Sequence, residues 1–166
     1  MNHDDAIAFL VQHQPLPPDR SLREDTIRTF DEIRRWLKNN PDESVLALVL
    51  NAFGDGTGHG VYQLIEDSLG AFEPSVVKGQ LKSSLASAHS SVRYWSAHIA
   101  ALYADDELVQ PLANLLRDPD PDARFAAAVA LDRNGSQAAL TELTDATRVP
   151  QPKEIGELIA TLLSRR

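Results

Sequence analysis

Residues Ser91–Ala100, with the sequence SVRYWSAHIA, recur in altered form 31 residues later as DARFAAAVAL, in Asp122–Leu131. Apolar positions in the segments before them match at the same offset. The matched pairs are Val77 and Leu108, Leu81 and Leu112, and Leu85 and Leu116. A fixed period of this length is typical of stacked supersecondary units, each too small to bury its own apolar face. The sequence therefore predicts an α-solenoid of helix-turn-helix repeats.

The same offset extends in both directions from this stretch, because Leu50 precedes Leu81 and Leu143 follows Leu112 by one period. We therefore expect one all-α domain, residues 1–166, folded as a right-handed α-solenoid. Its predicted units are residues 43–72, 74–103, 105–134 and 136–166. Residues 1–42 do not follow the period and are predicted to be N-terminal capping helices, which cover the exposed apolar end of a solenoid.

Within this cap, residues 3–14 have apolar side chains at helical spacing, and Pro15 ends the predicted helix. A second helix carries an apolar stripe that includes Ile27, Phe30 and Ile33. The sequence Ser21–Glu24 (SLRE) is typical of a capping box, in which Ser accepts from the backbone and Glu reaches back. It predicts that this second helix begins at Ser21.

Composition and charge narrow the range of possible functions. The chain has 166 residues, a formal net charge of −8 and no cysteine. This charge argues against nucleic acid, since binding to phosphates depends on Lys and Arg, and it favours a basic partner. The acidic N-terminus is unlike a signal peptide, and no segment is apolar for long enough to span a membrane. We expect a cytoplasmic protein that is a monomer on its own.

The segment Gly54–Gly60 (GDGTGHG) holds four of the eight glycines and leads into a predicted helix at Val61. Such a loop can bind an anion, because free N–H groups and the helix dipole point into it. It lacks the preceding strand, the Lys and the spacing of a nucleotide site. Asp55 and His59 could form an acid/base or metal pair, but with no third ligand nearby we favour a structural or partner-recognition role.

No pattern of catalytic residues is evident. The five His show no metal-binding spacing, and no Ser lies in a GxSxG sequence. The acidic turn Asp118–Asp122 lacks the glycine, the length and the terminal Glu of an EF-hand, and Asp122 is instead expected to cap the following helix. We therefore predict no catalytic residues, no metal and no cofactor.

The stretch Asp120–Leu131 resembles the second helix of a HEAT-type repeat, and Ser91–Ala97 resembles that of the neighbouring repeat. The short period is similar to that of compact bacterial HEAT-like repeats, which also occur in phycobilin lyases. In this family, the Arg of the second helix commonly pairs with an Asp of a turn. The resemblance implies such pairs for Arg93 and Arg124, whereas the first unit has Tyr62 at this position.

A second resemblance combines residues 54–62 (GDGTGHGVY) with Val92–Trp95. Together they look like small bacterial HEAT-like proteins that serve as immunity partners of polymorphic toxins, such as those of contact-dependent inhibition. This resemblance implies a non-catalytic protein that binds one toxin domain.

The second helix of each unit should line a concave binding surface. If Val92, Ser96 and Ile99 are buried, then Tyr94 and His98 face outward, whereas Trp95 and Phe125 either join them or fill gaps between helices. An exposed aromatic cluster is typical of an interaction hot spot. The predicted partner-binding residues are Tyr94, His98, Trp95, Phe125, Gln63, Asp67, Tyr62, Asp55 and His59.

The sequence thus favours an immunity protein that binds and neutralises a basic bacterial toxin domain. Fast capture of a cationic nuclease would suit the charge. The alternatives are a phycobilin-lyase-like protein that acts on a chromophore or small molecule, and a general protein-interaction adaptor. A DNA-glycosylase-like HEAT protein is disfavoured by the negative charge.

Overall fold

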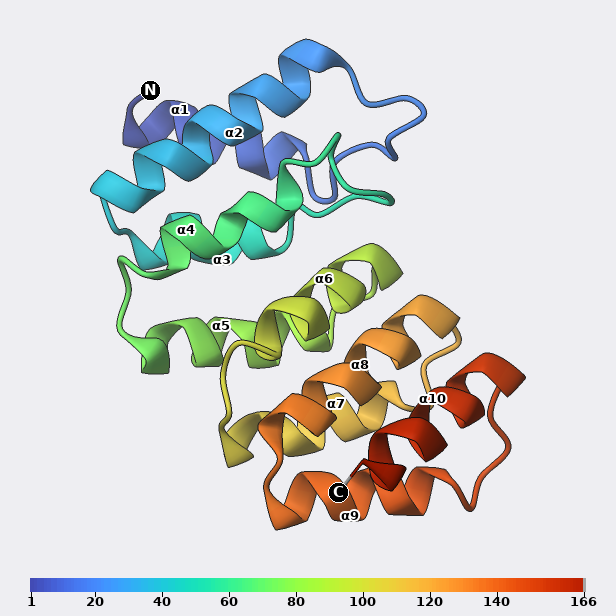
Figure 1. Ribbon diagram of the computed structural model, residues 1–166. Helices are drawn as coiled ribbons and strands as arrows, with labels where there is room; N and C mark the ends of the chain where they lie inside the picture. The colour runs from blue at the N-terminus through green and yellow to red at the C-terminus, as the bar shows by residue number, and fades with distance from the viewer. Residues whose placement is uncertain (166) are drawn as a thin grey trace. The chain divides into compact units, whose positions relative to one another are not determined.

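The computed structural model describes residues 1–165, and all of their regular secondary structure is helical (Figure 1). The chain divides into two compact units, Met1–Gln80 and Leu81–Arg166. The expected all-α fold of solenoid type is confirmed. The single domain and its repeat boundaries remain a prediction.

Unit 1 (Met1–Gln80) contains three longer α-helices and two short helical segments. They are α1 (His3–Gln12), α2 (Glu24–Asn39), α3 (Glu43–Leu50), the 3-10 helix η1 (Tyr62–Ile65) and α4 (Glu66–Leu69). Helix α1 packs against α3, and α2 packs against α4. The centre of the core is aromatic, because the rings of Phe30, Phe53 and Tyr62 meet edge to face at centroid distances of 5.3–6.3 Å.

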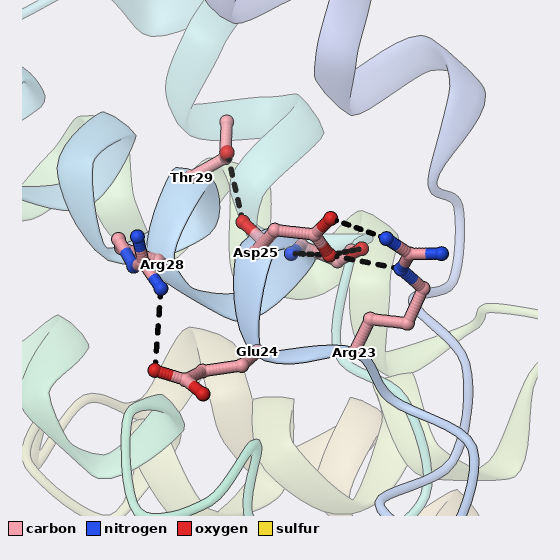
Figure 2. Close-up of polar contacts among 6 residues, drawn as sticks. Arg23, Glu24, Asp25, Arg28 and Thr29 are labelled. Atoms are coloured by element: carbon pink, nitrogen blue, oxygen red, sulfur yellow. Dashed lines mark hydrogen bonds and ion pairs between the residues drawn. The ribbon is translucent and has the colours of Figure 1, made fainter.

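The start of α2 differs from the predicted capping box. The Ser21 hydroxyl donates to the carbonyl of Pro18, and the helix begins at Glu24 without a side-chain cap. Asp25 instead accepts two hydrogen bonds from Arg23, at 3.0 and 2.7 Å. Figure 2 shows these contacts and the pair of Arg28 with Glu24. The hydrogen bond from Arg23 lowers the pKa of Asp25 to about 2. The prediction of a capping box was wrong because Ser21 lies in the preceding turn.

Helix α5 (Pro74–Leu85) contains residues of both units. Unit 2 (Leu81–Arg166) continues with five α-helices and one short 3-10 helix. They are α6 (Ser90–Ala100), η2 (Asp106–Leu108), α7 (Val109–Leu115), α8 (Pro121–Asn134), α9 (Gln137–Ala146) and α10 (Lys153–Ser164).

Helix α8 is central to unit 2, because it packs against α6, α7, α9 and α10. Its ends are well defined: the Asp120 side chain accepts from the N–H of Asp122, Pro121 follows, and Gly135 closes the helix at φ +68°. The cap is therefore Asp120, not Asp122 as predicted. A run of buried alanines, Ala126–Ala128, lets the neighbouring helices approach α8 closely.

The positions related by the 31-residue offset are buried as the period predicts. Leu50, Leu81, Leu112 and Leu143 all have exposed fractions of 1% or less. Each lies in the first helix of its predicted unit, where one apolar side chain per repeat contributes to the core.

Candidate functional site

Helices α6 and α8 enclose a hollow of about 210 Å³ within unit 2, called the α6–α8 groove below. It is lined by Tyr94, His98, Ala101, Phe125, Ala126, Val129 and Arg133. Tyr94, His98 and Phe125, which the sequence predicted for a binding surface, are thus brought together.

Helical spacing puts these side chains on facing stripes. Tyr94 and His98 are four residues apart on α6, and Phe125, Val129 and Arg133 follow one another at the same spacing on α8. Ala97 of α6 is fully buried, as are Ala127 and Ala128 of α8. Small side chains therefore join the two helices, while the large ones form the walls of the groove.

From the sequence, Trp95 and Phe125 could be either exposed or packed between helices, and the structure shows one of each. Trp95 is only 5% exposed, and its ring lies 5.4 Å from that of Tyr94 and 5.4 Å from that of His98, so it supports them from the core. Phe125 is 47% exposed and contributes to the groove. The rings of Tyr94 and His98 are nearly parallel, with an interplanar angle of 23° and a centroid distance of 6.5 Å.

The polar groups of the groove lack partners. In residues 1–165, the Tyr94 hydroxyl, the His98 ring nitrogens and the Arg133 guanidinium make no hydrogen bond or ion pair. None of the residues that line the groove is acidic. The groove therefore combines an apolar floor with groups that can donate hydrogen bonds.

An ion pair beside the groove fixes α6 to the turn before α8. The Arg93 Nε and Nη2 donate to the two carboxylate oxygens of Asp118, at 2.6 and 2.9 Å, and Nη1 donates to the Ser87 carbonyl at 2.8 Å. Burial opposes ionisation of Asp118, but the hydrogen bonds from Arg93 and from the N–H of Asp120 lower its pKa overall. Tyr94, which lines the groove, is the next residue of α6.

Arg124 follows the expected pattern only in part. Its Nε donates to the main-chain carbonyl of Asp118, and its Nη1 donates to the Gln151 side chain at 3.1 Å. Gln151 in turn donates to the carbonyl of Leu116 at 3.2 Å. The arginine thus bridges successive turns through neutral acceptors, because the next turn offers Gln151 where a ladder would need an acid.

In unit 1, the glycine-rich loop already holds a carboxylate of its own chain. Asp19 accepts hydrogen bonds from the N–H groups of Thr57 and Gly58, both at 2.8 Å, and from the Thr57 hydroxyl at 3.2 Å. Burial raises the pKa of Asp19, but these donors outweigh burial and lower it. The loop thus binds an anionic group, as such a sequence can, but that group is Asp19 of the same chain, in line with the structural role favoured from the sequence.

Tyr62 was expected at the partner-binding surface, and this prediction was wrong. Its side chain is fully buried, its hydroxyl accepts from the N–H of Gly54 at 3.1 Å, and desolvation raises its pKa to about 12. The ring lies against Gly58, where an added Cβ would come within 2.5 Å of it. The residue is part of the core.

The other predicted residues of unit 1 are exposed: Asp55, His59, Gln63 and Asp67. His59 has φ +51°, and its Nε2 lies 3.3 Å from the Leu22 carbonyl, whereas Asp55 uses its own carbonyl to accept from the N–H of Asp19. The Asp55–His59 pair has no third ligand, since no group of three His, Cys, Asp or Glu in residues 1–165 could hold a metal ion. Over the same residues, no helix is suited to spanning a bilayer.

Four residues of the groove are absent from the predicted binding residues: Ala101, Ala126, Val129 and Arg133. A signal for Arg133 was available, because it continues the stripe of Phe125 and Val129 along α8. It was overlooked because a basic residue in the last turn of a helix is readily explained by the helix dipole.

Paired helices at a regular period, with an open groove between second helices, define a helical-repeat protein of the scaffold class. Residues 80–163 match the family described as HEAT repeats. This protein belongs to the HEAT repeat family, whose members are typically non-catalytic scaffolds for protein interactions. No curated protein and no solved structure matches the chain.

Proposed function

We propose that this protein is an immunity protein, which binds one basic bacterial toxin domain and neutralises it. The observation that carries the proposal is the α6–α8 groove, where Tyr94, His98 and Phe125 form an aromatic surface with unpartnered polar groups. Aromatic residues at a concave surface are the usual anchors of a protein interface.

The charge supports a basic partner. Unit 1 carries 13 acidic and 7 basic side chains, whereas residues 81–166 carry 11 and 9. The excess of negative charge is therefore mainly outside the unit that contains the groove. Long-range attraction would speed the encounter, and the groove would supply the close contacts.

The size of the groove favours a protein side chain over a chromophore. Its volume of about 210 Å³ is below the roughly 300–1,000 Å³ of typical small-molecule sites. The shared surface of a repeat protein can extend beyond this hollow, so the groove serves as an anchor point within a larger interface.

A growth-rescue assay tests the proposal. Open reading frames adjacent to the gene are expressed with and without this protein in a heterologous bacterium. We expect one of them to encode a small basic protein that is toxic alone and harmless when this protein is present. Phe125→Glu should abolish rescue, while Val11→Glu, the same kind of change at an exposed apolar residue outside the groove, should not. A neighbourhood with no toxic reading frame, or rescue that survives Phe125→Glu, would contradict the proposal.

A further inference from the structure

The α6–α8 groove contains no acidic residue, although the chain as a whole is acidic. The protein carries a net charge of −8, yet the side chains that line the groove include Arg133 and His98 and no carboxylate. A basic side chain would therefore find no ion-pair partner inside the groove. What enters it should offer acceptors instead.

Arg133 is the strongest of these unpartnered groups. It lies in the last turn of α8, where the helix dipole favours a cation, and its side chain is exposed. The dipole explains why a cation is stable there, but it supplies no acceptor for the five N–H donors of the guanidinium. A carboxylate matches these donors in a bidentate geometry.

The apolar part of the groove lies at a set distance from this cation. Phe125 and Arg133 are eight residues apart on one helix, which corresponds to about 12 Å along its axis. An extended peptide advances about 3.3 Å per residue, so a ligand can reach both ends with an apolar residue and an acid about four residues apart, which also places both side chains on the same face of the strand. The volume of about 210 Å³ leaves room for one large side chain beside Val129 and Ala126.

We propose that the α6–α8 groove receives an extended segment of the partner protein in which an apolar side chain is followed by an Asp or Glu. The apolar side chain packs on Phe125 and Val129. The carboxylate pairs with Arg133 and accepts a hydrogen bond from His98 or Tyr94. This inference rests on the proposed function for the identity of the partner, but the groove chemistry can be tested without it.

The positive charge of Arg133 in the groove would let the protein discriminate among basic partners. A basic partner that is attracted by the whole protein would meet a cation at the groove, and only a partner with a local acid could dock there. Other cationic proteins would be captured transiently and released.

The test uses two blocked peptides, Ac-Phe-Gly-Gly-Gly-Glu-NH2 and Ac-Phe-Gly-Gly-Gly-Gln-NH2, titrated into the full chain and followed by NMR. We expect the amides around Phe125, Val129 and Arg133 to shift with the Glu peptide, and at least tenfold weaker binding of the Gln peptide. Arg133→Glu should remove this preference. Arg117→Glu, the same charge change at an exposed site outside the groove, should retain it. Equal binding of the two peptides, or no shift at millimolar concentration, would overturn the inference.

These outcomes separate the two proposals. If the Glu peptide binds as expected but no toxic reading frame is rescued, the groove chemistry holds and the immunity role fails. If rescue is observed but is indifferent to Arg133→Glu, the immunity role holds and the acidic–apolar segment is wrong. The spectrum of each variant also reports whether it is folded.

Discussion

At the scale of single residues, a buried hydroxyl group of α6 is unsatisfied. The Ser96 hydroxyl of α6 is fully buried and has no hydrogen-bond partner in residues 1–165. One period later, the corresponding residue is Ala127, which is also fully buried. A methyl side chain therefore fits at this position of the repeat. The buried Ser96 hydroxyl lowers stability, because it loses its hydrogen bonds to water and gains none in the protein.

We therefore expect Ser96→Ala to raise the free energy of unfolding by about 1 kcal/mol, because it removes a buried polar group that makes no bond. Urea denaturation followed by circular dichroism measures this change. Ser68→Ala is the matched control: Ser68 is equally buried, but its hydroxyl donates to the Arg34 carbonyl at 2.9 Å. That variant should be destabilised by about 1 kcal/mol. An equal decrease in the free energy of unfolding of the two variants would show that the Ser96 hydroxyl is not an unsatisfied group.

Asp19 gives a prediction for the dependence of stability on pH. Its pKa is lower in the folded protein than its ordinary value of 3.8, because the donors of Thr57 and Gly58 outweigh the effect of burial. A lowered pKa contributes stability that is present above the unfolded value and is lost as the pH falls through the folded value. The contribution should therefore be complete at pH 7, begin to decline near the ordinary value of 3.8, and disappear only below the lower pKa of the folded protein.

Asp19→Asn should lower the free energy of unfolding by about 1–2 kcal/mol at pH 7, and this difference should shrink as the pH approaches 3. Thermal or urea unfolding of both proteins between pH 3 and 7 measures it. Asp55→Asn, in the glycine-rich loop that Asp19 contacts, removes an exposed carboxylate for which the structure shows no side-chain hydrogen bond, and it should have little effect. A difference that is constant with pH would refute the role of the ionised carboxylate.

At the scale of elements, the Arg93–Asp118 pair connects α6 to the turn before α8. Both side chains are largely buried, and the geometry is bidentate. Removing one partner leaves the other charge buried without compensation, which is costly.

We expect Arg93→Ala to lower the free energy of unfolding by about 3 kcal/mol. Arg93→Lys should recover only part of this, because a lysine cannot reproduce the bidentate contact. The control is Arg28→Ala, which removes the exposed pair with Glu24 (Figure 2) and should cost no more than about 0.5 kcal/mol. Chemical denaturation measures all three variants. A loss below 1 kcal/mol for Arg93→Ala would show that the pair contributes little.

The sequence predicted the features that follow from regular helices, and it missed those that depend on contacts between distant residues. The period gave the buried leucines and put Tyr94, His98 and Phe125 on one surface, because both follow from regular helical spacing. Tyr62 was misplaced because its ring packs against Phe30 and Phe53, and neither contact follows from the 31-residue period. Asp19 could not be found as the ligand of the loop, since it lies 38 residues before Thr57 and no local pattern links them.

At the scale of the whole molecule, the two compact units share helix α5, which contains residues on both sides of position 80. Repeat proteins are stabilised by contacts between neighbouring units, so their folding is cooperative when those contacts are strong. An uninterrupted helix across the boundary favours such coupling. We therefore retain the prediction that the chain unfolds as one domain.

A perturbation confined to unit 1 tests this cooperativity. Gly58 has φ +58°, and a Cβ there would overlap the ring of Tyr62, so Gly58→Ala should destabilise the protein by roughly 2 kcal/mol or more. Gly70→Ala is the control, since nothing lies within 4 Å of its added Cβ. In hydrogen exchange followed by mass spectrometry, a single domain loses protection in both units to the same extent. If Gly58→Ala lowered protection only in residues 1–80, the two units would be independent folding domains, and the groove between α6 and α8 would keep its structure when unit 1 opens.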